Sequence, residues 1–488
     1  MYLARLSSYR FKAWLCCDRL RPVTDPRDPS AMKAQINRTF TFTLPLAMAE
    51  LAYISMAFTD TFLFSLLGVE TLAGAGLGTS MLHFMTIVFM GLVAGVGNLV
   101  AIAYGAQRDD EINATVQAGV LVSLVLFCMA LCVVAVSPQL LAAFGQGDGL
   151  VRDAYAYMSV AVWSVLPILL LRVFRGLSTG VGHRISIFKV SVFGALLNFP
   201  LSYALMEGVL FVPQLGILGV GIATSIVALL MLVTFLYDIY KRERFRNWQI
   251  WRVRTSYQSL SCAVRNVLQM GLPIGVAYGM EAGLFAVAGL LAGSLGAVAL
   301  ASHHIALQCS IVAFRIPAAI AQATSALVGQ SFGASQPQMV RAFAMSGLVL
   351  GAAYSVLSSF VFLVFPDVLV SIFVSANSAE NFAVIQTATV LLAIAAAFQL
   401  ADGLQVIAMG ALRGLRRTYM PTILTVSGYW LVGLPAAFLL SRIDGVSGIW
   451  WGLALGLGAT AVMLVLLLHR VCGNMNAKLD LQTMKGAT

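Results

Sequence analysis

Long apolar runs, about twelve in number, divide this 488-residue chain and constrain its fold more than any other feature. A helix needs about 20 apolar residues to cross the hydrocarbon core of a bilayer. Only 10% of the residues are charged, whereas a soluble domain has about 25%. A chain this apolar requires lipid as its solvent. The sequence therefore predicts an all-α polytopic membrane protein with about 12 transmembrane helices.

Lysine and arginine are distributed unevenly along the loops and span ends. The expected spans are 38–66, 75–104, 115–137, 153–173, 187–206, 216–238, 264–293, 299–331, 342–365, 384–411, 419–440 and 446–469. The two tails and the alternate loops, with the adjoining span ends, hold 27 of the 30 basic residues, and the opposite loops hold only Arg152 and Arg442. Basic loops stay on the cytoplasmic side. This bias predicts that both termini are cytoplasmic.

The two halves of the chain look like a repeat. A shift of 228 residues places 44–106 on 272–334 without a gap and aligns Pro45 with Pro273. Six spans per half make the repeat parallel, with a pseudo-two-fold axis along the membrane normal. The expected parts are a basic N-terminal tail 1–37, an N-lobe 38–240, a cytoplasmic linker 241–262, a C-lobe 263–470 and a C-terminal tail 471–488.

Several functional classes are disfavoured by the sequence. The net charge of +10 comes from basic residues between apolar runs, which does not suit nucleic-acid binding. The seven cysteines contain no C-x-x-C, so neither disulfides nor a zinc site are expected. The motifs of a P-loop, a zinc protease and a serine hydrolase do not occur. We therefore expect no enzyme and no cofactor.

Four acidic residues lie well inside the expected spans, away from the span ends: Glu50, Asp60, Glu281 and Asp402. Because a carboxylate in the bilayer is costly, such residues usually face a cavity and serve an ion or a substrate. No lysine lies in mid-span to neutralise them. They are candidates for holding a proton or a cation, and packing between helices is the structural alternative.

Asp60 has suitable polar neighbours on two other spans. Asn198 and Ser202 are four residues apart on one face of span five, and span six carries Thr224. A carboxylate with amide and hydroxyl oxygens is a ligand set that suits Na⁺. The same carboxylate, removed from water, would also bind H⁺. The residues leave both coupling ions open.

A polar stripe on span ten accompanies the C-lobe acids. Gln399, Asp402 and Gln405 recur every three residues and share a helix face. Asp402 and Glu281 are the candidate cation or proton ligands of this lobe. The candidates for lining a substrate cavity are Gln399, Gln405, Tyr53, Tyr278 and Glu50.

Two other polar features fall near or within span eight. Arg315 lies inside the span and is expected to pair with a carboxylate of its own lobe or to extend toward water. His303 and His304 lie near the outer end. A hydrogen bond at the helix end is favoured there over a pH-sensing role.

Five motifs, in order and on the expected spans, give the chain a resemblance to the multidrug and toxic compound extrusion (MATE) family, in its NorM-like bacterial branch. They are Phe58-Thr59-Asp60-Thr61, Tyr104-Gly105-Ala106-Gln107, Leu197-Asn198-Phe199-Pro200-Leu201, Gly271-Leu272-Pro273 with Glu281, and Gln399-x-x-Asp402-x-x-Gln405 followed by Gly410-x-x-Arg413-Gly414. The resemblance covers about residues 38–470.

The resemblance implies a V-shaped, two-lobe antiporter that expels cationic or amphipathic organic compounds in exchange for H⁺ or Na⁺. It places Asp60, Asn198 and Thr224 at the N-lobe ion site, and Glu281 and Asp402 at the C-lobe acids. Ser202 departs from the asparagine of close relatives, which leaves a sodium preference open. We expect a monomer in a bacterial inner membrane. The alternatives are a flippase for lipid-linked saccharides and a dedicated exporter of a metabolite or siderophore.

Overall fold

The computed structural model describes residues 29–66, 69–209, 213–242, 245, 257–374 and 379–486. The regular structure of this part of the chain is helical throughout. Most of the expected tail 1–37, most of the linker 241–262 and the last two residues of the tail 471–488 lie outside the described residues.

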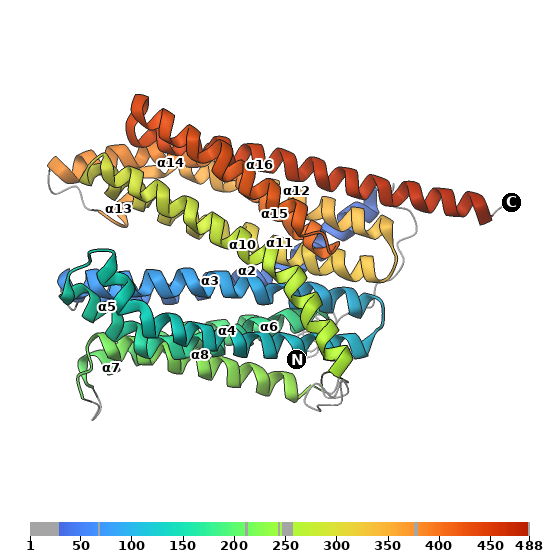
Figure 1. The fold of residues 1–488 in the computed structure, drawn as a ribbon. Coiled ribbons are helices and arrows are strands. Elements are labelled where there is room, and N and C mark those ends of the chain that lie inside the picture. Colours follow the sequence, from blue (N-terminus) through green and yellow to red (C-terminus); the bar gives the residue numbers. More distant parts are fainter. Residues whose placement is uncertain are drawn as a thin grey trace, which may run out of the picture.

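The helices form two bundles, which are drawn in blue to green and in yellow to red in Figure 1. The first bundle contains α2 (Pro29–Leu66), α3 (Val69–Gly105), α4 (Asp109–Ala143), α5 (Asp148–Ala161), the short 3-10 helix η1 (Val162–Ser164), α6 (Val165–Gly180), α7 (Ile185–Glu207) and α8 (Ile217–Tyr240). The second contains α10 (Tyr257–Ser294), α11 (Ala297–Gly333), α12 (Pro337–Val364), α13 (Pro366–Ser371), α14 (Ala379–Gly414), α15 (Tyr419–Ser427), the π-helical turn η2 (Gly428–Gly433) and α16 (Leu434–Gly486).

The predicted number of membrane crossings is confirmed. Among the described residues, 11 helices are long and apolar enough to cross a membrane. The last of them, Tyr419–Met475, is interrupted by the non-helical residues Asp444 and Gly445. Gly445 has a φ of 56°, which suits a glycine at a reversal between two helices. This interruption divides the segment into the predicted spans 419–440 and 446–469.

Several helices extend beyond the predicted spans. α10 begins at Tyr257 and α16 continues to Gly486, whereas the apolar runs suggested 264 and 469. An apolar run marks only the part of a helix that meets lipid. A helix can continue into water because its backbone hydrogen bonds are internal.

Prolines lie inside several spans, as expected, and one freed carbonyl has a visible partner. Pro317 in α11 cannot donate to the carbonyl of Ala313. That carbonyl accepts a hydrogen bond of 3.0 Å from the hydroxyl of Tyr354 in α12. A neighbouring helix therefore satisfies the backbone group that the proline leaves free.

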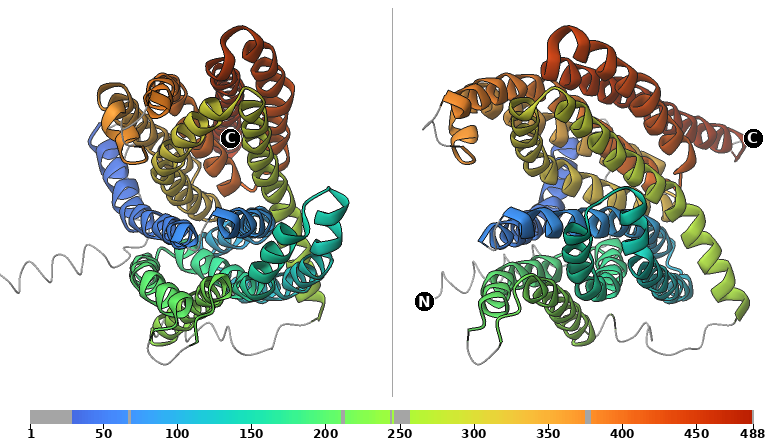
Figure 2. Two further views of the ribbon diagram at one scale, coloured as in Figure 1. Left: turned by 90° about the vertical axis from the view of Figure 1, so that its left-hand side faces the viewer. Right: turned by 60° about the vertical axis from the view of Figure 1, so that its left-hand side comes forward.

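The contacts between the bundles follow the predicted repeat. The first helix of each half packs against the second and third helices of the other half: α2 contacts α11 and α12, and α10 contacts α3 and α4. Figure 2 shows α10 passing from the first bundle to the second. This exchange supports a pseudo-two-fold relation between the halves.

The bundles join at one end only. One continuous hydrophobic cluster covers the first bundle and includes residues of the second bundle such as Val267, Leu327 and Leu412, which lie toward the linker. Residues toward the opposite end, including Ala288 and Phe398, form a separate cluster. The halves are therefore packed together on the linker side and diverge away from it, as a V-shaped fold requires.

Glycines permit the close approach of α3 and α10. A Cβ added to Gly91 would lie 2.8 Å from the backbone nitrogen of Gly275. We expect Gly91→Ala to force the two helices apart and to destabilise this arrangement by about 1–3 kcal/mol. The matched control is Gly76→Ala in the same helix, because a Cβ there meets nothing within 4 Å. Thermal unfolding in detergent should show a lower midpoint for Gly91→Ala alone, and equal midpoints would contradict this packing.

Candidate functional site

The predicted N-lobe residues meet around Asp60. The carboxylate of Asp60 in α2 accepts hydrogen bonds from the Asn198 amide of α7 at 3.3 Å and from the Thr224 hydroxyl of α8 at 3.4 Å. Asn198 is fully buried. Tyr157 of α5 also lies within electrostatic range of the carboxylate. Residues of α2 therefore meet residues of α7 and α8, more than 100 positions later in the chain, in one polar site.

Ser202 does not bind the Asp60 carboxylate. Its side chain is fully buried one turn from Asn198, and its hydroxyl has no hydrogen-bond partner among the described residues. The hydroxyl is thus an additional oxygen near this site. A role of Ser202 in holding the coupling ion stays a prediction.

The C-lobe acids are brought together from α10 and α14. The charges of Glu281 and Asp402 lie close enough to interact. Neither carboxylate forms a hydrogen bond or a salt bridge of 4.0 Å or less with any residue that the structure describes. Like charges repel strongly in a medium of low dielectric constant. A proton, a metal cation or an organic cation between them would relieve that repulsion.

The two glutamines of the stripe flank Asp402 and retain free polar atoms. Gln399 and Gln405 are 1% and 3% exposed. The Gln399 Nε2 and the Gln405 Oε1 have no partner in the described part of the chain. Buried polar groups without partners are uncommon. These atoms are available for a ligand or for water.

Tyr429, which the sequence analysis did not single out, completes this group. It lies in the π-helical turn η2, is fully buried, and its hydroxyl accepts a hydrogen bond from Gln405 Nε2. It is also within electrostatic range of Glu281 and Asp402. The next residue, Trp430, donates to the carbonyl of Met280 at 3.1 Å. The turn therefore ties α10 and α14 together beside the acids, and π-helical turns often occur at functional sites.

Arg413 supplies positive charge on the linker side of the C-lobe acids. Its charge acts on Glu281. Its Nη1 donates to the Tyr278 hydroxyl at 3.3 Å, and its guanidinium lies 5.2 Å from the centre of the Tyr278 ring. The predicted cavity residue Tyr278 thus has an intramolecular partner. Its contact with a substrate stays a prediction.

Glu50 forms a buried ion pair with Arg175 of its own half, at a position where the two halves meet. Its Oε1 accepts hydrogen bonds from Arg175 of α6 at 3.0 Å and from Gln322 of α11 at 3.3 Å. Arg315 of α11 lies 3.9 Å from the other oxygen. Tyr53, another predicted cavity residue, is within electrostatic range of Glu50.

The positions of two arginines correct the sequence analysis. The expected span 153–173 leaves Arg175 in the basic loop that follows, but α6 continues to Gly180 and the Arg175 side chain is only 11% exposed. Arg315 was expected to pair within its own lobe, whereas its carboxylate partner belongs to the other half. Charge pairing across the repeat cannot be read from hydropathy, since it depends on which helices exchange between the bundles.

His303 is held by a hydrogen bond near the start of α11. The indole nitrogen of Trp450 in α16 donates to His303 Nδ1 at 3.2 Å, and His303 is fully buried. The expected hydrogen bond is present, and its donor is a side chain from another helix. This contact explains the histidine without a pH-sensing role.

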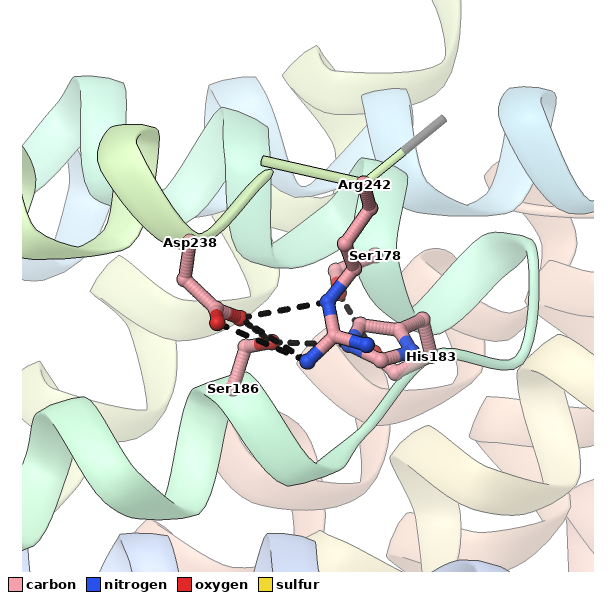
Figure 3. Close-up of polar contacts among 5 residues, drawn as sticks. All are labelled: Ser178, His183, Ser186, Asp238 and Arg242. Carbon is pink, nitrogen blue, oxygen red and sulfur yellow. Dashed lines mark hydrogen bonds and ion pairs between the residues drawn. The ribbon is translucent and has the colours of Figure 1, made fainter. Parts of the chain in front are cut away.

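A second polar cluster lies at the linker end of the first bundle (Figure 3). Asp238 of α8 accepts hydrogen bonds from Ser186 and, at 3.3 Å, from Arg242. Ser186 lies 2.8 Å from His183 Nε2, and Ser178 donates to the carbonyl of His183. In a catalytic triad the histidine stands between serine and acid, but here the serine stands between them. The cluster fastens the α6–α7 turn to the end of α8.

The halves, the exchanged helices and the paired acids define the class of a two-lobe polytopic membrane protein. The chain belongs to the MatE family, whose model matches residues 45–204 and 273–439, one segment in each half.

The relatives include proteins described as NorM. The chain is 35% identical over 424 residues to a probable multidrug resistance protein NorM of Pseudomonas aeruginosa, covering 86% of each chain. It is 33% identical to the multidrug resistance protein NorM of Burkholderia vietnamiensis, covering 90% of this chain and 95% of the relative.

Solved structures share the fold. The MATE transporter VcmN of Vibrio cholerae in the bent form superposes with a TM-score of 0.81 at 18% identity, covering 92% of this chain and 99% of that one. The eukaryotic MATE transporter AtDTX14 superposes with a TM-score of 0.77 at 19% identity, covering 91% and 99%. The V-shaped, all-helical fold expected from the sequence is confirmed.

Proposed function

We propose that this chain is a secondary antiporter that exports cationic or amphipathic organic compounds from a cell in exchange for H⁺ or Na⁺. The family and its multidrug resistance relatives support efflux. The observation that carries the proposal is the pair Glu281 and Asp402, two intramembrane carboxylates without a hydrogen-bond partner among the described residues. Such a pair attracts cations and can also be neutralised by them.

The mechanism follows from competition for these carboxylates. When Glu281 and Asp402 are ionised, they attract an organic cation in surroundings of low dielectric constant. When they hold H⁺ or Na⁺, that attraction weakens and the organic cation is released. Transport requires in addition that the ion and the compound favour different orientations of the protein, because a ligand shifts an equilibrium only by its differential affinity.

The Asp60 site is the second place where the coupling ion acts in this proposal. Asn198 and Thr224 donate to the carboxylate, and both also carry oxygen atoms that can bind a cation. The same carboxylate accepts a proton in the alternative with H⁺. Asp60 lies on α2, one of the exchanged helices, so a change of its charge can alter the packing between the halves.

The proposed orientation places the linker end in the cytoplasm of a bacterium and the protein in its inner membrane, with both termini cytoplasmic. The concentration of basic residues toward the linker side supports this orientation. The described arrangement, which is closed at the linker end, then represents an outward-facing state. Each chain holds both sites within its own helices, which supports function as a monomer.

Ethidium efflux from bacteria that lack their own pumps tests the proposal. Cells expressing the chain should lose preloaded ethidium faster than cells with an empty vector, and a protonophore or removal of external Na⁺ should stop the efflux. Immunoblots of the membrane fraction confirm that the protein is present. Efflux that matches the empty vector despite normal expression would contradict multidrug export and favour a dedicated cargo.

Tyr429→Phe should reduce efflux while the protein still folds and reaches the membrane. The variant keeps the buried ring but leaves Gln405 Nε2 without its acceptor, which costs about 1–3 kcal/mol for a buried donor. We expect the initial rate of ethidium efflux to fall about tenfold. Tyr354→Phe is the matched control, since its hydroxyl donates to the backbone carbonyl of Ala313 rather than to a residue of the acid site. Equal rates for the two variants would show that Tyr429 has no special part in the acid site.

A further inference from the structure

The seam between the two halves is the region around Glu50, where α2 and α6 of the first half meet α11 of the second. The side chains there carry more positive than negative charge. Three arginines, Arg172, Arg175 and Arg315, act electrostatically on the single carboxylate of Glu50. Arg175 binds that carboxylate directly. The remaining two guanidinium groups therefore exceed the negative charge that the cluster supplies.

Arg315 is incompletely satisfied by its neighbours. Its Nη1 lies 3.9 Å from Glu50 Oε2, which is longer than a hydrogen bond. Its Nε is buried and has no partner among the described residues. Arg172 likewise makes no hydrogen bond or ion pair with any residue in the described part of the chain. Unmatched cationic donors inside a membrane protein are costly.

The position of Arg315 makes it accessible to a transported molecule. It is the central residue of α11, which runs from Ala297 to Gly333. Its side chain is 27% exposed, whereas that of Glu50 is 10% exposed. The two residues come from opposite halves, so Arg315 lies where the bundles meet and close to the point from which they diverge. A guanidinium presents paired donors that match a carboxylate.

We propose that Arg315, assisted by Arg172, is a subsite for the carboxylate of an organic substrate. This inference rests on the proposed function and adds one contact to it, a cationic subsite for the anionic end of the exported compound. The carboxylate supplies the negative charge that the cluster lacks and takes the free donors of Arg315, while Arg175 and Gln322 continue to hold Glu50.

A matched pair of dyes tests the subsite. Rhodamine B carries a free carboxylate, and rhodamine B ethyl ester has the same ring system without that charge. Fluorescence anisotropy with the purified protein in detergent measures binding of each dye independently of transport. We expect Arg315→Gln to weaken binding of rhodamine B about tenfold and to leave binding of the ester unchanged. Arg315→Lys, which keeps the charge but loses the paired donors, should be intermediate.

The controls separate a subsite from a general defect. Arg341→Gln, at an exposed position in α12, should change neither affinity, and Arg172→Gln provides a second test if Arg315→Gln does not accumulate.

An equal loss of affinity for both dyes would show that Arg315 has a structural role, and this would overturn the subsite. A wild-type protein that binds only the ester would also overturn it. If efflux fails but the selective loss of rhodamine B binding is present, the subsite stands and the transport proposal is contradicted.

Discussion

Asp402→Asn is expected to lower the initial rate of ethidium efflux about a hundredfold while the protein still accumulates in the membrane. The change keeps the size of the side chain but removes its ability to ionise. The asparagine cannot attract the cation that the carboxylate binds. Losing one partner of such a desolvated charge interaction costs about 2–5 kcal/mol, and about 2.7 kcal/mol corresponds to a hundredfold effect. Because Asp402 makes no hydrogen bond with a described residue, the fold should tolerate the asparagine.

The control for this prediction is Asp367→Asn, the same chemical change at an exposed acid of the second half. Its efflux should equal that of the wild type. Glu281→Gln should resemble Asp402→Asn, since the two carboxylates act together. Wild-type efflux by Asp402→Asn, measured at equal membrane levels, would exclude the C-lobe pair as the site of coupling.

Glu50→Gln should produce the second large effect, on stability. The Glu50 and Arg175 side chains are only 10% and 11% exposed, and removing one member of a buried ion pair costs about 3–5 kcal/mol. Without Glu50, three arginines face one another across the seam. We expect a lower midpoint of thermal unfolding in detergent and less protein in the membrane.

The double variant Glu50→Gln with Arg175→Gln separates charge from packing. It removes one negative and one positive charge, so the excess of charge in the cluster returns to that of the wild type. Its unfolding midpoint should lie above that of Glu50→Gln alone. A double variant that is less stable than both single variants would show that side-chain packing, rather than charge balance, determines stability at this seam.

Much of the fold could be predicted from the sequence because the segments that contact lipid must be apolar. The apolar runs located the crossings, and the turn at Asp444 and Gly445 falls in the predicted gap. The helix ends were less accurate. At the ends of α10 and α16, polar residues continue the helix outside the bilayer, where hydropathy carries no signal.

The contacts of Asp60 with Asn198 and Thr224 could be expected from the sequence because a lone intramembrane carboxylate needs polar neighbours. Asp60, Asn198 and Thr224 meet as expected, while Ser202 remains apart from the carboxylate. Assigning these residues to an ion or a substrate stays a prediction, since geometry alone does not identify the ligand.

Two parts of the candidate sites could not be predicted from the sequence, for different physical reasons. Tyr429 depends on a π-helical turn, which rotates it toward Gln405 in a way that a regular helical period does not anticipate. The Glu50 cluster depends on the exchange of α2 between the bundles. Neither the turn nor the exchange leaves a periodic signal in a single sequence.

Transport by the purified protein in liposomes tests cation-coupled antiport most directly. A pH gradient or a Na⁺ gradient is imposed separately, the membrane potential is clamped with valinomycin and equal K⁺, and uptake of tetraphenylphosphonium is followed. The account predicts accumulation above that of protein-free liposomes under at least one gradient, and its loss in Asp60→Asn and Asp402→Asn. Uptake that is independent of both gradients, or that persists in both variants, would contradict it.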